Sequence, residues 1–97
     1  MQAKGGLVYM MTNRPAGVLY IGVTADLVRR ASEHRAGEIA GFTRRYGLKR
    51  LVYFERHDDI RDAIAREKSL KKWRRVWKDE LIAKANPGWD DLYKGIL

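Results

Sequence analysis

Three stretches, 7–11, 18–23 and 51–55, are rich in β-branched, aromatic and other apolar residues and have the composition of strands. In the first two, successive side chains would alternate between two faces, which is the period of a strand. The stretch 12–17, Thr-Asn-Arg-Pro-Ala-Gly, is dense in turn-forming residues and has the length of a hairpin loop. We therefore predict that 7–11 pairs antiparallel with 18–23 and that 51–55 adds a third strand.

Elsewhere the apolar period changes to that of an α-helix. Helices are predicted over 27–36, 60–72 and 73–85. Asp26 is in position to cap the first of them, and Asp58 or Asp59 the second. Gly37 and the sequence Asn86-Pro87-Gly88 are typical signals for the end of a helix.

The remaining segments complete the predicted fold. The stretch 38–49 has too little periodicity for a long element and is predicted to be a loop holding at most a helical turn. A bend is expected near 72–75, and the apolar residues of 89–97 are expected to pack back on the domain. The order strand, strand, helix, loop, strand, helix, helix predicts a small α+β fold in which helices flank a three-stranded sheet. We expect one domain over 1–97, with its core at about 7–89.

One acidic residue does not fit the helical pattern. On a helical wheel Ile60, Ala63, Ile64 and Leu70 form an apolar stripe, and Glu67 falls near its middle. A carboxylate that faces a core is costly unless it is paired or binds a metal ion. Lys71, one turn later, is in position to form an ion pair with Glu67.

Composition limits the classes of function. The 97 residues carry a formal net charge of +8 and contain no cysteine. Such a basic chain suits a polyanionic partner, with nucleic acid the first candidate and an anionic membrane surface the second. The absence of cysteine excludes a disulfide framework, a zinc-thiolate site and a thiol nucleophile. There is no apolar run long enough to span a bilayer and no signal-peptide pattern, so we expect a cytoplasmic protein.

Five side chains from predicted strands and helices together suit phosphodiester hydrolysis: Tyr9, Tyr20, Arg30, His34 and Glu67. Arg30 and His34 lie four residues apart on one helix face. An arginine can stabilise charge on a phosphate, and a tyrosine or a histidine can accept a proton from water. A single carboxylate can hold a divalent cation that keeps most of its waters.

The motifs that hold these residues resemble the GIY-YIG nuclease superfamily. Tyr20-Ile21-Gly22 is preceded by Leu7-Val8-Tyr9 and followed by Arg30 and His34 on one helix and Glu67 on a later one. The run from Tyr20 to His34 is similar to the small stand-alone bacterial members, and the resemblance extends from Leu7 to about Trp89. The first motif reads Leu-Val-Tyr instead of Gly-Ile-Tyr, a change that keeps its tyrosine.

The resemblance implies a three-stranded antiparallel sheet flanked by helices and cleavage of DNA by water with one divalent metal ion, Mg²⁺ or Mn²⁺. It implies that Glu67 is the metal ligand and that Arg30 stabilises the phosphate. Tyr9 and Tyr20 would form a pair in which one serves as, or assists, the general base. His34 would assist proton transfer or contact the phosphate.

The resemblance also bears on positions around this set. It implies that Gly22 lets the backbone turn tightly beside the site and that Asn86 corresponds to a late asparagine of the family. Some members carry a lysine soon after the second motif, where this chain has Val23 and Thr24. The resemblance therefore gives no support here to a mechanism assisted by that lysine.

Basic residues outside this set are candidate contacts to nucleic acid: Arg44, Arg45, Lys49, Arg50 and Lys71. The first four are expected in a loop near the strand ends, where they would contact phosphates. Trp73 and Trp77 could stack on bases, but tryptophans at helical spacing are more often part of a core.

Our leading hypothesis is a metal-dependent DNA endonuclease that is structure-selective with low sequence specificity. The sequence leaves RNA open as a substrate and does not determine the oligomeric state, for which a monomer is favoured. A role in DNA repair is an expectation from the family alone. The first alternative is a domain of the same fold that binds nucleic acid without cutting it. A second is a regulatory adaptor between proteins. Taken one at a time, the tyrosines, Arg30 and His34 also have ordinary structural roles, as half-buried strand residues or helix surface charges.

Overall fold

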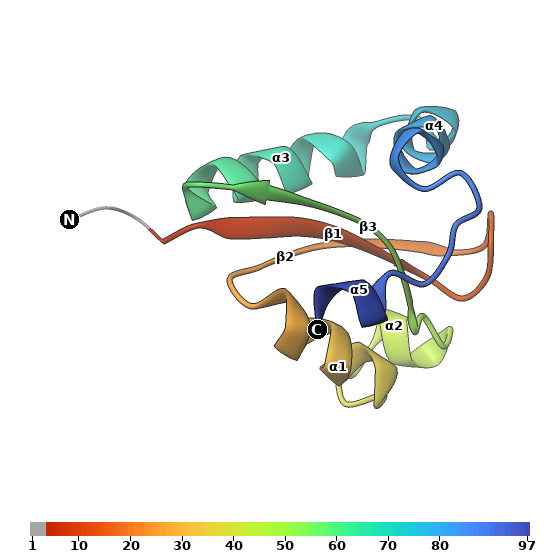
Figure 1. Cartoon of the computed structure of the whole chain (residues 1–97). Helices are drawn as coiled ribbons and strands as arrows, with labels where there is room; N and C mark the ends of the chain where they lie inside the picture. The colour runs from red at the N-terminus through yellow and green to blue at the C-terminus, as the bar shows by residue number, and fades with distance from the viewer. Residues whose placement is uncertain (1–3) are drawn as a thin grey trace.

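The computed structural model describes residues 4–97, which form a three-stranded antiparallel sheet flanked by helices (Figure 1). The strands are β1 (Gly6–Thr12), β2 (Leu19–Thr24) and β3 (Arg50–His57), in the sheet order β2-β1-β3. The helices are α1 (Leu27–Arg35), α2 (Phe42–Arg45), α3 (Ile60–Lys72), α4 (Arg75–Ala85) and α5 (Tyr93–Ile96). The predicted α+β fold and the antiparallel hairpin are confirmed. Within residues 4–97, no helix is long and apolar enough to cross a membrane.

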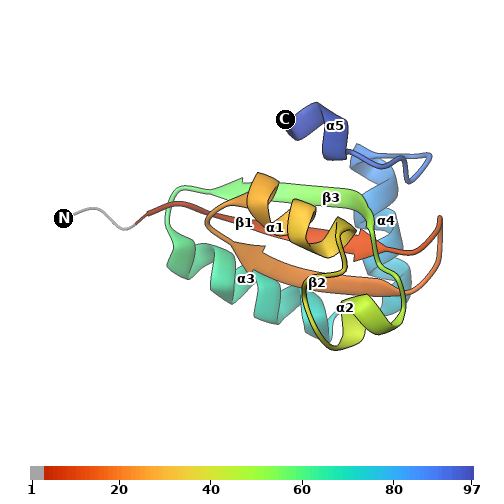
Figure 2. The same cartoon turned by 90° about the horizontal axis from the view of Figure 1, so that it is seen from below.

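The helices form one layer on each face of the sheet. α3 and α4 cover one face, and α1, α2 and α5 cover the other (Figures 1 and 2). Because β1 is the central strand, its side chains alternate between the two layers. β2 and β3 are the two edges of the sheet.

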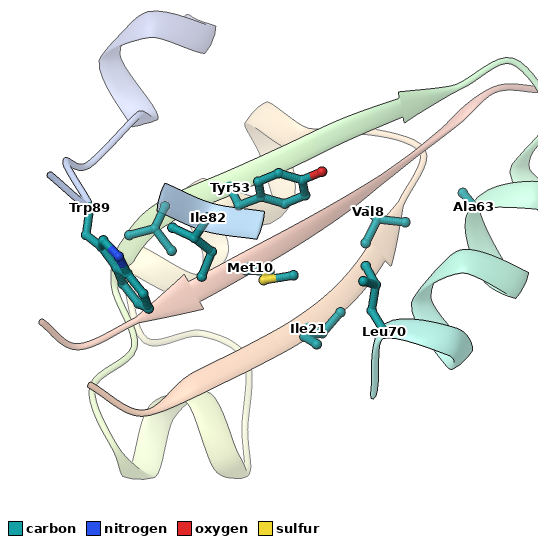
Figure 3. Close-up of a cluster of buried hydrophobic side chains, with 9 residues drawn as sticks. Val8, Met10, Ile21, Tyr53, Ala63, Leu70, Ile82 and Trp89 are labelled. Carbon is teal, nitrogen blue, oxygen red and sulfur yellow. The ribbon is translucent and has the colours of Figure 1, made fainter. Parts of the chain in front are cut away.

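The layer between the sheet and α3 and α4 is an apolar core (Figure 3). Even-numbered residues of β1 point into it, together with residues from both other strands and both helices. Its buried members are Val8, Met10, Ile21, Val52, Tyr53, Ala63, Leu70, Ile82 and Trp89. Trp89 comes from the segment after α4, so the expected return of the C-terminal tail onto the domain is confirmed.

The layer on the opposite face is smaller and contains polar side chains as well. Its buried apolar members are Tyr9, Met11, Leu27, Leu48 and Leu51. Leu92 and Ile96 of the tail pack against them. This is the face that carries Tyr9, Arg30 and His34 of the candidate site, whereas Glu67 belongs to α3 on the opposite face.

The strand boundaries differ slightly from those that the sequence predicts. β3 is longer at both ends than 51–55, because its pairing with β1 runs from Gly6 opposite His57 to Thr12 opposite Arg50. The register shifts between Met10 and Met11, and this irregularity places one extra residue on β3. Composition predicts the centre of a strand, whereas its ends are set by the partner strand.

Trp77 and Ile64 are more exposed than their positions on a helical wheel predict. Trp73 and Arg74 have extended backbone angles and separate α3 from α4, at the predicted bend. The break changes the phase of the second helix, so that Ile82 faces the sheet and Trp77 is 47% exposed. The expectation that Trp77 belongs to the core is therefore wrong. Ile64 is also exposed, so the apolar stripe of α3 is narrower than the wheel suggests.

Candidate active site

Three aromatic side chains from two strands and one helix form a compact cluster on the α1 face of the sheet. The ring centroids of Tyr9 and Tyr20 are 6.2 Å apart, and His34 lies 5.6 Å from the first and 5.5 Å from the second. A hydrogen bond of 2.8 Å joins the Tyr9 Oη and the His34 Nε2. Tyr9 and Tyr20 therefore lie side by side, as the resemblance implies, and His34 joins them.

Gly22 makes this cluster possible by leaving space for the rings. It lies in β2 directly opposite Tyr9 of β1. A Cβ atom at this position would lie 2.6 Å from the Tyr9 Oη, 2.7 Å from its Cζ and 2.9 Å from the Tyr20 Cε2. Gly22 is therefore required by the packing of the two rings, and it lies within a strand instead of at the tight turn that the resemblance implies.

His34 is held in a buried position by the local structure of α1. Asp26 caps this helix by accepting a hydrogen bond from the Arg29 amide, as predicted, and the last turn of the helix then directs His34 inward. The residue is only 3% exposed, and its Nδ1 has no hydrogen-bond partner among the described residues. Burial, reinforced by the nearby charge of Arg30, lowers the pKa of the imidazole below its ordinary value. His34 is therefore a neutral imidazole at neutral pH.

Tyr9 is also neutral at neutral pH. Burial is the main cause that raises its pKa, followed by the neighbouring Tyr20, while the charge of Arg30 acts in the opposite direction. The carboxylate of Glu67 contributes a further small increase. The hydroxyl of Tyr9 is thus within electrostatic range of Arg30 on α1 and of Glu67 on α3, which come from opposite layers.

Arg30 lies on the same helix as His34, and its charge acts on both Tyr9 and His34. Its side chain is partly exposed, and its Nε is 3.7 Å from the Oε1 of Glu33. Glu33 also lies 3.9 Å from the Arg29 Nε. A pocket in this region is lined by Thr24, Ala25, Asp26, Arg29, Arg30 and Glu33. Glu33 is not among the residues predicted from the sequence, although its spacing of three residues from Arg30 on one helix is a recognisable signal for this ion pair.

Glu67 lies in the C-terminal half of α3, with a side chain that is 15% exposed. The Lys71 Nζ is 3.2 Å from its Oε1, so the predicted ion pair is present. Among residues 4–97, no three or more His, Cys, Asp or Glu side chains gather into a possible metal site. Glu67 is therefore a single, largely shielded carboxylate near the tyrosine cluster.

The other basic candidates are divided between two regions. Arg44 and Arg45 are on α2, and Lys49 precedes β3. Arg50 is the first residue of β3, and its side chain donates a hydrogen bond of 3.2 Å to the Trp89 carbonyl oxygen. Lys71 is on α3 and pairs with Glu67. The first four are close in sequence on the α1 side of the molecule, and Lys71 lies apart from them.

Asn86 is engaged within the fold. It is buried, and its Nδ2 donates to the carbonyl oxygens of Val52 (3.0 Å) and Asp90 (2.9 Å). Its Oδ1 accepts a hydrogen bond from the Asp90 amide. Both amide hydrogens are therefore used to hold the turn after α4 against β3.

Comparison with known proteins identifies relatives of this chain. A family model described as the GIY-YIG catalytic domain matches residues 5–80. A UPF0213 protein of Haloquadratum walsbyi is 43% identical over 63 residues, which cover 65% of this chain and 71% of the relative. UPF0213 proteins of Natronomonas pharaonis and Clostridium perfringens are each 42% identical over 65 residues, covering 67% of this chain and 76% and 70% of the respective relatives. No solved structure matches the chain. From the family match, together with the fold and the motifs, we conclude that the chain belongs to the GIY-YIG family of nucleases.

Proposed function

We propose that this protein is a metal-dependent endonuclease that hydrolyses DNA phosphodiester bonds, with Tyr9, Tyr20, Arg30, His34 and Glu67 as its site. The observation that carries the proposal is the buried hydrogen bond between Tyr9 and His34, beside the ring of Tyr20. The Tyr9 hydroxyl is within electrostatic range of the positive charge of Arg30 and the negative charge of Glu67. A buried hydrogen bond of this kind contributes only about 0.5–1.5 kcal/mol to the free energy of unfolding. It has a clear use where water must lose a proton to attack a phosphate.

The pKa values favour one path for that proton. A neutral phenol is a very weak base, and an unperturbed tyrosine with a pKa of about 10 is ionised in only about one molecule in a thousand at pH 7. Burial makes the Tyr9 phenolate rarer still. In the proposed path Tyr9 Oη takes the proton of the attacking water while its own proton passes over 2.8 Å to the neutral His34 Nε2. The tautomer with hydrogen on Nδ1 leaves Nε2 free to accept it.

Arg30 is the group that would stabilise the phosphate. Its guanidinium can donate two parallel hydrogen bonds to phosphate oxygens, and this arrangement becomes more favourable as negative charge develops. In the free protein Arg30 lies beside Glu33, which holds the side chain near the pocket. Tyr20 packs against both Tyr9 and His34 and would fix the orientation of the proton-transfer pair.

GIY-YIG nucleases generally use a divalent metal ion, and Glu67 is the residue that would hold it here. A single carboxylate suits Mg²⁺ or Mn²⁺, because an ion that keeps several waters needs only one or two protein ligands. The absence of a larger cluster of ligands among the described residues agrees with such a hydrated ion. When bound, the ion would supply Lewis-acid polarisation of a phosphate oxygen. Lys71 would have to move from Glu67 to make room for it.

The test is cleavage of duplex, flapped, branched and single-stranded DNA by the purified protein, with Mg²⁺, Mn²⁺ or EDTA. We expect cleavage only with a divalent ion, preference for one DNA shape over the others, little dependence on sequence, and a loss of about a hundredfold or more in Glu67→Gln. Glu80→Gln is the matched control, because this carboxylate lies on α4, outside the proposed site. Binding to DNA without cutting by any preparation would reject the enzyme and support the non-cleaving alternative.

A further inference from the structure

An exposed pair of aromatic rings lies on α2, outside the proposed catalytic residues. Phe42 and Tyr46 are 47% and 44% exposed, and their ring centroids are 4.9 Å apart. The Arg45 guanidinium carbon lies 5.6 Å from the centre of the Tyr46 ring. A recess in the surface is lined by the same short segment, from Gly41 to Tyr46. We call the set Phe42, Arg44, Arg45 and Tyr46 the α2 platform.

The fold holds the platform in this outward position. Thr43 and Leu48 are buried, and the Leu48 amide donates a hydrogen bond of 2.9 Å to the Thr43 carbonyl oxygen. Gly41 and Gly47 on either side have positive φ values of 99° and 63°, which suit glycine. A small polar residue thus faces inward while two large aromatic rings face solvent. This is the reverse of what burial of apolar surface favours.

The charge around the platform points to a polyanion. No acidic residue occurs from Ile39 to Phe54, a stretch that contains Arg44, Arg45, Lys49 and Arg50. Among the described residues, none of these four forms an ion pair. Aromatic rings beside unpaired guanidinium groups match a strand that offers base faces and phosphates together. The exposed Trp77 is a poorer match, because Glu80 lines the pocket beside it.

The platform also lies on the same side of the sheet as the tyrosine cluster. α1 and α2 belong to one layer (Figures 1 and 2). Leu48, two residues after Tyr46, packs in the same cluster as Tyr9. One nucleic-acid strand could therefore contact both regions without crossing the sheet.

We propose that the α2 platform binds single-stranded DNA by stacking unpaired bases on Phe42 and Tyr46 while Arg44 and Arg45 contact the flanking phosphates. The inference rests on the proposed function for the identity of its partner as DNA. It goes further in naming the part of the substrate, an unpaired segment next to the site of cleavage. In a duplex the base faces are already stacked on each other, so the platform would favour unpaired over paired DNA.

The experiment measures binding by fluorescence anisotropy in EDTA, so that no cleavage occurs. The three probes are a labelled DNA single strand, the same strand with abasic sites at its centre, and the corresponding duplex. The double variant Phe42→Ala/Tyr46→Ala is expected to weaken single-strand binding about fivefold to a hundredfold and duplex binding less than about twofold. The wild type should also bind the abasic strand more weakly.

Matched variants separate stacking from other effects. Phe42→Tyr/Tyr46→Phe keeps both rings and should keep the affinity, whereas Trp77→Ala removes an equally exposed ring elsewhere and should change nothing. Circular dichroism confirms that each variant is folded. If Phe42→Ala/Tyr46→Ala lost affinity equally for all three probes, or lost none for any of them, the inference would be overturned. A selective loss in a protein that cuts no DNA would reject the nuclease and keep the platform.

Discussion

The two faces of the sheet are built from alternate residues of the same strands, yet they bury different chemistry. On the α3 and α4 face, Val8 and Met10 of β1 join an apolar core, and the hydroxyl of its member Tyr53 donates a 2.6 Å hydrogen bond to Glu55. On the α1 face, Tyr9 contacts His34, whose Nδ1 is buried without a partner among residues 4–97. In the part of the chain that the structure describes, the only buried side-chain polar atom without a partner is on the α1 face.

This difference separates stability from function. A buried polar atom without a partner costs about 1–3 kcal/mol, a cost that a purely aliphatic layer would avoid. Among residues 4–97, the fold bears this cost on the face that carries Tyr9 and His34 of the proposed site. Equivalent changes on the two faces should therefore have different consequences for cleavage, even where their effects on stability are similar.

The largest effect is expected for Gly22→Ala. The new methyl group would collide with the rings of Tyr9 and Tyr20, and overpacking of this kind lowers the free energy of unfolding by about 1–3 kcal/mol. Cleavage should fall with it, because the rings must move. Urea unfolding and cleavage assays measure the two effects.

Gly95→Ala is the control for that change, because a Cβ at Gly95 has no neighbour within 4 Å. We expect its stability and cleavage to match those of the wild type. A Gly22→Ala protein with unchanged stability would show that the cluster can adapt to a larger residue, and the close packing described above would then have no functional consequence.

A smaller change in stability is expected for Tyr9→Phe and Tyr53→Phe, one on each face. Each variant removes a hydroxyl that forms one hydrogen bond, which contributes about 0.5–1.5 kcal/mol to the free energy of unfolding. Tyr9→Phe should reduce cleavage about a hundredfold or more, since the proton path is lost. Tyr53→Phe should cleave normally.

This pair is the most direct test of the difference between the faces. Both tyrosines have raised pKa values, chiefly through burial, with that of Tyr53 at about 12. A raised pKa therefore does not by itself mark the functional residue. Equal activities of the two variants would remove Tyr9 from the mechanism and leave both hydroxyls with structural roles only.

The sequence predicts the elements of this fold well because their signals are local. Alternation in 7–11, the cap at Asp26 and the stop after Ala85 each depend on a few neighbouring residues. The exposure of Trp77 could not be predicted in the same way. It depends on how the break at Trp73 and Arg74 turns α4 relative to the sheet.

The candidate site likewise has features that the sequence predicts and features that depend on how distant elements pack. The motif places Tyr9, Tyr20 and His34 on elements that must meet, and the structure brings them together. The reason for Gly22 is not visible in the sequence, because the colliding ring belongs to a residue opposite it on another strand. Similarly, Phe42 and Tyr46 are exposed because Thr43 and Leu48 are the residues of this segment that face inward, and the sequence does not show which residues those are.

The smallest effect concerns the pH dependence of stability. The pKa of His34 is lower in the folded protein than its ordinary value of about 6.5, so the unfolded chain binds more protons in this range. The stability that neutral His34 contributes is complete above about pH 6.5 and is lost as the pH falls through the pKa of His34 in the folded protein. For one group the slope is at most about 1.4 kcal/mol per pH unit. Thermal unfolding of wild type and His34→Gln between pH 7.5 and 5.5 should show a shallower dependence in the variant.

The same titration distinguishes the two possible proton acceptors in cleavage. If neutral His34 receives the proton through Tyr9, the rate should be constant near neutral pH and fall only below about pH 6.5. If the Tyr9 phenolate were the base, its raised pKa would make the rate climb steadily up to strongly alkaline pH. His57→Gln is the control, since this histidine is bound to Glu55 near the other face. A rate that rises about tenfold per pH unit from 7 to 9 would therefore replace the relay with a phenolate and leave His34 only a positioning role.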